Sequence, residues 1–112
     1  MKSNEEKIFV IYTTRDIYVN NQSLYRIFKE LEKLGDVFID LLHNNSIDKQ
    51  EYVIKKLHEC SSIVIVDTPE LEKSEWAKLE ITIAKKEGKK ILGYYKLEFF
   101  NNQPVLVFTK RI

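Results

Sequence analysis

Two uninterrupted apolar runs constrain the fold of this chain more than any other feature of its sequence. Ile8–Tyr12 and Ile63–Val66 consist entirely of β-branched, aliphatic and aromatic residues. A strand with one face in water alternates apolar and polar residues, so a continuous run indicates a strand that is buried on both faces. Helices must then cover both sides of the sheet. The sequence therefore predicts an α/β protein with a mainly parallel sheet.

Segments with helical and strand-like patterns alternate along the rest of the chain. The predicted helices centre on residues 24–34, 52–57 and 74–86, and the other predicted strands are residues 37–39, 90–95 and 105–108. Gly35 and Gly88 are expected to end the first and last of these helices. Spacing of this βαβ kind predicts right-handed crossovers and the strand order 2-1-3-4-5. The last strand can instead pair antiparallel, because residues 97–104 contain no helical pattern.

Length and composition favour one globular domain over residues 1–112, with a flexible N-terminus at 1–7 and a hairpin-like tail at 96–112. The 18 basic and 17 acidic residues give a net charge of +1, so we expect no nucleic-acid partner. No apolar run approaches the length of a membrane span, which predicts no membrane partner. The lone cysteine, Cys60, is expected to be a buried apolar residue of a cytoplasmic protein.

One acidic residue stands out in the helix predicted to begin near Ser74. At helical spacing, Trp76, Leu79, Ile83 and Ala84 form an apolar stripe, and Glu80 lies inside it. A carboxylate in such a stripe loses water on folding. It must be paired, be shifted toward its neutral form, or face a pocket. Glu80 is therefore the principal candidate for a functional residue.

The predicted topology places this acid near a ligand-binding edge. In open α/β sheets, ligands bind beyond the carboxyl ends of the strands. Here that edge consists of residues 12–16, 40–46 and 67–76. Trp76, one turn before Glu80, offers a flat surface for a base or a sugar. The structural alternative is that Glu80 forms a surface ion pair with Lys78 or Lys85.

Several common kinds of site are not supported by the sequence. Three glycines are too few for a dinucleotide fingerprint or a phosphate-binding loop. His43 and His58 have no partners at metal-ligand spacing, so we expect no metal site. The first strand runs into Tyr12 and two threonines rather than into the acidic cluster of a phosphoacceptor domain. No nucleophile elbow is present.

A resemblance to a known family rests on an ordered set of segments. Residues 74–80 (Ser-Glu-Trp-Ala-Lys-Leu-Glu) resemble the Ser-x-Trp-Cys-x-x-Glu segment of TIR (Toll/interleukin-1 receptor) domains, with Ala77 in place of the cysteine. Residues 9–16 are similar to the opening strand and polar box of that family. Residues 31–40, 60–66 and 84–91 are similar to its second box, central strand and fourth strand. The similarity covers residues 8–95.

This resemblance implies a flavodoxin-like/TIR-like three-layer sandwich and a bacterial-type NAD-processing enzyme. NAD would be the substrate, and no further cofactor is implied. Glu80 would be the catalytic residue at the nicotinamide ribose, where a carboxylate can stabilise or trap the oxocarbenium-like state. By the same resemblance, the substrate-binding residues are Tyr12, Thr13, Arg15, Asp40 and Trp76. Self-association into a homo-oligomer through TIR-like contacts is also implied.

Two other functions remain open at the level of sequence. One is a noncatalytic TIR-like module that binds a nucleotide or associates with itself. The other is a nucleoside 2-deoxyribosyltransferase, a family with a similar fold and a Glu-x-x-x-Ala helix, as in Glu80 to Ala84. That family resembles the chain less, because residues 71–76 lack its Gly-rich, Asp-containing lead-in.

Overall fold

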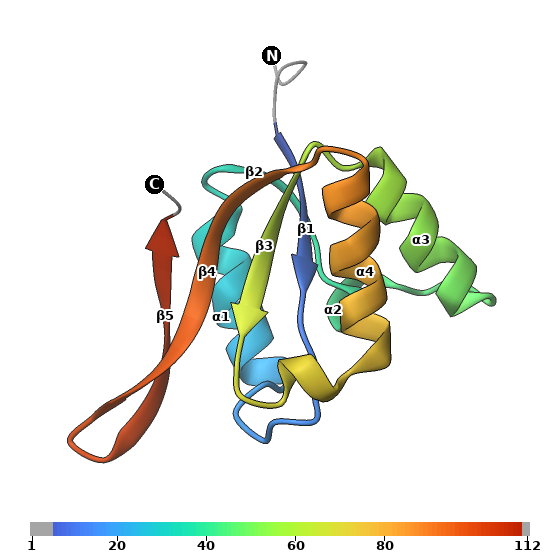
Figure 1. The fold of residues 1–112 in the computed structure, drawn as a ribbon. Coiled ribbons are helices and arrows are strands. Elements are labelled where there is room, and N and C mark those ends of the chain that lie inside the picture. The colour runs from blue at the N-terminus through green and yellow to red at the C-terminus, as the bar shows by residue number, and fades with distance from the viewer. Residues whose placement is uncertain (1–5, 111–112) are drawn as a thin grey trace.

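The computed structural model describes residues 6–110, which form a five-stranded sheet with helices on both faces (Figure 1). The strand order is β2-β1-β3-β4-β5, as predicted. The first four strands in this order are parallel, and β5 pairs antiparallel with β4. The strands are β1 (Glu6–Ile11), β2 (Gly35–Phe38), β3 (Ser62–Asp67), β4 (Lys90–Phe100) and β5 (Gln103–Lys110). The predicted mainly parallel α/β sheet is confirmed.

Helices divide the buried core into two layers. On one face, α1 packs Leu24 and Ile27 against alternate residues of the central strands, such as Val10 and Val64. The helices α3 and α4 cover the other face, where Phe9 lies in the core (Figure 1). This division follows from the two apolar runs, whose successive side chains point to opposite faces. The helices are α1 (Asn21–Leu31), α2 (Asp40–His43), α3 (Lys49–Glu59), η1 (Leu71–Lys73) and α4 (Glu75–Lys86).

Polar side chains fix where the longer helices begin. The Asn20 side chain accepts a hydrogen bond from the Ser23 amide, and Ser23 Oγ accepts one from the Asn20 amide, which forms a capping box. Asp48 caps α3 as predicted, and Ser74 Oγ accepts a 3.1 Å bond from the Ala77 amide at the start of α4. These bonds satisfy amides that have no partner inside the helix.

The first helix ends three residues earlier than predicted. The helix α1 ends at Leu31, and Leu34 is 51% exposed rather than part of the apolar stripe. Gly35 does not end the helix but begins β2. A Cβ atom at this position would lie 2.4 Å from the Glu6 carbonyl oxygen on the neighbouring strand. The glycine is therefore needed for close approach of the two strands. At the end of α4, Gly88 does adopt the predicted left-handed conformation, with φ +71°.

Three other predicted boundaries need correction. The sequence predicts no helix within residues 40–46, but Asp40 to His43 form the short helix α2. The hairpin does not start at residue 96, because β4 runs without a break from Lys90 to Phe100 and turns at Asn101–Asn102. Of the N-terminus predicted to be flexible, residues 6 and 7 lie in β1. Residues 1–5 lie outside the described part of the chain, as do 111 and 112.

No helix within residues 6–110 is long and apolar enough to cross a membrane. The same residues contain no group of three or more His, Cys, Asp or Glu side chains arranged to hold a metal ion.

Candidate functional site

A cleft of about 270 Å³ lies at the carboxyl end of β1, beside the first half of α4. Residues from four segments line it: the end of β1 and the loop after it, the start of α2, the residue before α4, and α4 itself. They include Tyr12, Thr13, Asp40, Leu41, Trp76 and Glu80. The cleft therefore occupies the edge of the sheet at which ligands of open α/β proteins are expected.

The helix α4 presents a different face to the sheet from the one predicted. Its buried residues are Ala77, Glu80 and Ala84, whereas Trp76 is 37% and Leu79 is 43% exposed. The larger apolar residues are spread around the helix, and the two alanines let its backbone approach the sheet closely. Glu80 lies between those alanines at the centre of the buried face and is only 5% exposed. The predicted burial of Glu80 and Ala84 is confirmed, whereas Trp76 and Leu79, which were expected on the same buried face, are exposed.

Glu80 has no ion-pair partner among residues 6–110. Lys78, one of the two proposed partners, instead pairs with Glu75 at 3.1 Å. The pKa of Glu80 is raised to about 8, mainly by burial and to a smaller extent by the nearby Asp40 carboxylate, while a hydrogen bond from the Trp76 side chain opposes part of this rise. Glu80 is therefore a desolvated carboxyl group in a cleft, not half of a surface ion pair.

Tyr12 and Asp40 line the cleft from the end of β1 and the start of α2. The Tyr12 hydroxyl accepts a 2.8 Å hydrogen bond from the Leu41 amide, which joins the end of β1 to α2. Asp40 Oδ1 accepts a 2.7 Å bond from the side chain of Asn44, one turn later. Burial raises the pKa of Tyr12, and the charges of Asp40 and Glu80 raise it further. Tyr12 thus stays a neutral phenol, and the charge of the cleft comes from Asp40 and, once pH rises through about 8, from Glu80 as well.

The predicted substrate-binding residues do not all meet in this cleft. Tyr12, Thr13, Asp40 and Trp76 line it together with Glu80. Arg15 is exposed and is not part of the lining, because the chain turns at Thr13, whose hydroxyl accepts a hydrogen bond from the Arg15 amide. The lining as described contains no lysine or arginine.

Sequence reasoning missed several residues of this region. Phe9 and Val10 form part of the cleft lining, but apolar strand residues give no signal that separates a pocket wall from core. A smaller hollow of about 120 Å³ adjoins the cleft, with Asp40 and Trp76 common to both, and brings Lys49 to its edge. Lys49 Nζ donates a 2.8 Å bond to the Asn44 carbonyl. Nothing in the sequence distinguishes Lys49 from the other basic residues.

The polarity of the cleft determines which reactions it can assist. A desolvated carboxyl group interacts strongly with a positive charge that forms beside it, because little water screens the interaction. A second acid adds to the negative potential, and an indole ring supplies a flat wall. The cleft is therefore suited to a reaction that develops positive charge on a small planar or sugar-like group.

The influence of Asp40 on Glu80 can be tested directly. We expect Asp40→Asn to lower the pKa of Glu80, because a like charge is removed while the side chain can still accept the Asn44 hydrogen bond. The decrease is expected to be a minor fraction of the total shift, since burial is its larger cause. Carbon-detected NMR titration of the side-chain carboxyl measures it. Asp36→Asn, outside the cleft, is the control, and an unchanged Glu80 titration in Asp40→Asn would contradict the assignment.

No protein-family model matches the chain, and a search of curated proteins finds no significant relative. The functional argument therefore depends on the geometry and polarity of the cleft.

Proposed function

We propose that the protein is a TIR-like enzyme that cleaves the nicotinamide N-glycosidic bond of NAD, as a glycohydrolase or a cyclase, with Glu80 as the catalytic carboxylate. The observation that carries this proposal is the position of Glu80. It is a buried acid without an ion-pair partner among the described residues, it lies in a cleft at the carboxyl end of β1, and it is one turn from Trp76.

The reaction requires the features that this cleft offers. In NAD the nicotinamide ring carries a positive charge on the nitrogen that is bonded to the ribose. When that bond breaks, the nitrogen takes both electrons and nicotinamide leaves as a neutral base, so no proton donor is needed. Positive charge then develops on the ribose, where a carboxylate can stabilise it or form a bond to the anomeric carbon. Water completes hydrolysis, whereas a nitrogen of the adenine ring would complete cyclisation.

The other residues of the cleft have supporting roles in this proposal. Trp76 would form a wall against the nicotinamide or the ribose, and Tyr12 and Thr13 would line the mouth. Asp40 would increase the negative potential at the developing cation. NAD is the substrate, and the proposal requires no additional cofactor or metal. The strand order and the helices on both faces support a flavodoxin-like/TIR-like assignment of the fold.

Incubation of the concentrated protein with NAD tests this function. We expect release of free nicotinamide, measured by liquid chromatography, with ADP-ribose or its cyclic form as the second product. Parallel reactions contain a deoxynucleoside and a free base. Base exchange without NAD turnover would instead identify a deoxyribosyltransferase. A raised melting temperature with NAD but no turnover would identify a nucleotide-binding module.

A further inference from the structure

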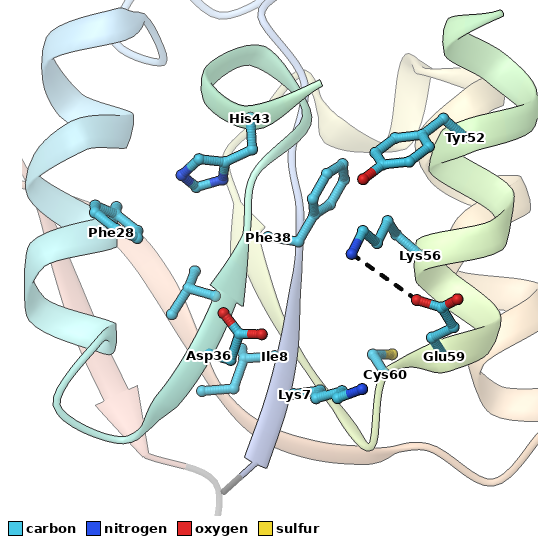
Figure 2. A pocket seen from close by; sticks show the side chains of 11 residues that line it. Lys7, Ile8, Phe28, Asp36, Phe38, His43, Tyr52, Lys56, Glu59 and Cys60 are labelled. Atoms are coloured by element: carbon cyan, nitrogen blue, oxygen red, sulfur yellow. Dashed lines mark ion pairs between the residues drawn. The ribbon is translucent and has the colours of Figure 1, made fainter. Parts of the chain in front are cut away.

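A second hollow follows the outer edge of the sheet and is separate from the Glu80 cleft. The strand β2 is at this edge, and among the strands of residues 6–110 it pairs only with β1. Its free side opens into a groove of about 390 Å³ between α1 and α3. In Figure 2, Phe28 and His43 lie on one side of this groove, with Tyr52 and Lys56 on the other. The groove and the cleft share no lining residue.

The backbone of β2 presents hydrogen-bonding groups to this groove. The Ile39 amide, just after the strand, donates a 2.9 Å bond to His43 Nδ1 and so points away from β1. Backbone groups alternate in direction along a strand, so the N–H and C=O of Val37, two residues earlier, also point away from β1. Val37 is only 8% exposed but lines the groove, and the His43 imidazole occupies the next outward-pointing amide, that of Ile39. An unpaired edge of this kind is a template for another strand.

The side chains on the two sides of Val37 along the groove carry opposite charges. Asp36 and Phe38 lie on the face of the sheet that α3 covers. Lys56 Nζ lies 5.9 Å from the centre of the Phe38 ring and 3.9 Å from a carboxylate oxygen of Glu59, with which it forms an ion pair. Asp36 makes no ion pair within the described part of the chain. Along this edge, Asp36 therefore precedes Val37, and the Lys56 ammonium lies over Phe38, which follows Val37.

We propose that β2 pairs antiparallel with β2 of a second copy of this chain, about a two-fold axis at Val37. The two Val37 residues then exchange N–H to C=O hydrogen bonds. Asp36 of each copy lies directly opposite Phe38 of the other, in a pair whose side chains approach closely. The Asp36 carboxylate therefore meets the Lys56 ammonium of the other copy. Symmetry gives this ion pair twice.

The self-complementary charge pattern favours a second copy over an unrelated peptide. An isologous interface requires that each partner supply both members of every contact. This edge does so, because the acid and the base flank the residue on the proposed axis. Leu34 and Leu41, just before and just after β2, are about half exposed and border the edge at both ends. The inference does not depend on the proposed enzymatic function.

Charge reversal with rescue tests the pairing. We expect a concentration-dependent dimer in analytical ultracentrifugation, and we expect Asp36→Lys or Lys56→Glu to weaken it about tenfold, since each places like charges together at two sites. The double variant is expected to regain most of the affinity. Glu98→Lys, near the tip of the β4–β5 hairpin, and Lys55→Glu, next to Lys56, make the same charge changes outside the groove. Neither is expected to alter the dimer.

Amide hydrogen exchange gives a measurement that does not rely on variants. We expect the Val37 amide of the wild-type protein to become more protected as concentration rises, while exposed amides of the β4–β5 hairpin do not change. A chain that is monomeric at all concentrations would overturn the proposal. A dimer that is insensitive to both charge reversals, or a double variant without rescue, would also overturn it. Binding of an unrelated peptide in the groove, without dimer formation, would overturn the proposal as well.

Discussion

Replacing Glu80 with glutamine is expected to reduce the turnover of NAD by about 10²- to 10³-fold, the usual loss when one group that stabilises charge in a transition state is removed. Glutamine keeps the size and most of the packing of the side chain but cannot carry a negative charge. The loss is therefore expected in kcat more than in KM, because the positive charge on the ribose develops mainly in the transition state. Steady-state rates of nicotinamide release measure both constants.

The pH dependence of this activity has a defined sign. The proposed reaction needs the carboxylate, and the pKa of Glu80 is about 8 in the free protein. We therefore expect kcat/KM to rise with pH and to level off above about 8, because kcat/KM reports on the free enzyme. Glu75→Gln is the matched control, since Glu75 is an exposed acid on the same helix that pairs only with Lys78 among the described residues. Equal activity of Glu80→Gln and wild type would rule out the catalytic role.

The second large effect is on stability. The pKa of Glu80 is raised on folding from an ordinary 4.5 to about 8. Between these two pH values the unfolded chain has lost the proton and the folded chain keeps it. Folded-state stability therefore falls as pH rises across this window, by about 1.4 kcal/mol per unit from this group. Above pH 8 a charged Glu80 costs a few kcal/mol, which Glu80→Gln removes.

Chemical denaturation followed by circular dichroism measures this difference. We expect the free energies of unfolding of wild type and Glu80→Gln to be nearly equal near pH 4.5, with the variant more stable by a few kcal/mol above pH 8. Ionisable groups that do not interact with Glu80 cancel in this comparison. Glu75→Gln is expected to change stability by less than about 1 kcal/mol at any pH, because its ion pair is exposed. A Glu80→Gln variant that is less stable than wild type at high pH would indicate a structural partner for the carboxylate.

The sheet could be predicted from the sequence because its signals are local and strong. The runs at residues 8–12 and 63–66 are apolar at every position, and only a central strand between two helical layers uses such a run in full. The strand order followed from the βαβ spacing. Gly35 shows the limit of this reasoning. A glycine after a helical pattern resembles a helix end, but the close approach of Glu6 from another strand decides its role.

The candidate site was less predictable, because it depends on which face of α4 packs against the sheet. Trp76 and Leu79 are the most hydrophobic side chains in the first half of α4, so they were expected to face the core. The helix instead buries Ala77 and Ala84, because small residues allow it to lie close to the sheet. Glu80 lies both in the predicted apolar stripe and on the face that is actually buried, so its burial was predicted despite that error. Arg15 was expected at the site only because residues 9–16 resemble the polar box of TIR domains. The turn at Thr13, which its hydroxyl helps to form, could not be inferred from the residue types.

The position of Trp76 also makes the cleft observable without any label. Trp76 is the single tryptophan of the sequence, and it lines the cleft together with Glu80 and Asp40. Its indole is partly exposed, so the intrinsic fluorescence of the protein excited in the tryptophan band originates at the proposed site. A ring that stacks on this indole quenches the emission, and a charge change on the neighbouring carboxyl alters it. Occupancy and ionisation of the cleft can therefore be followed optically in the wild-type protein.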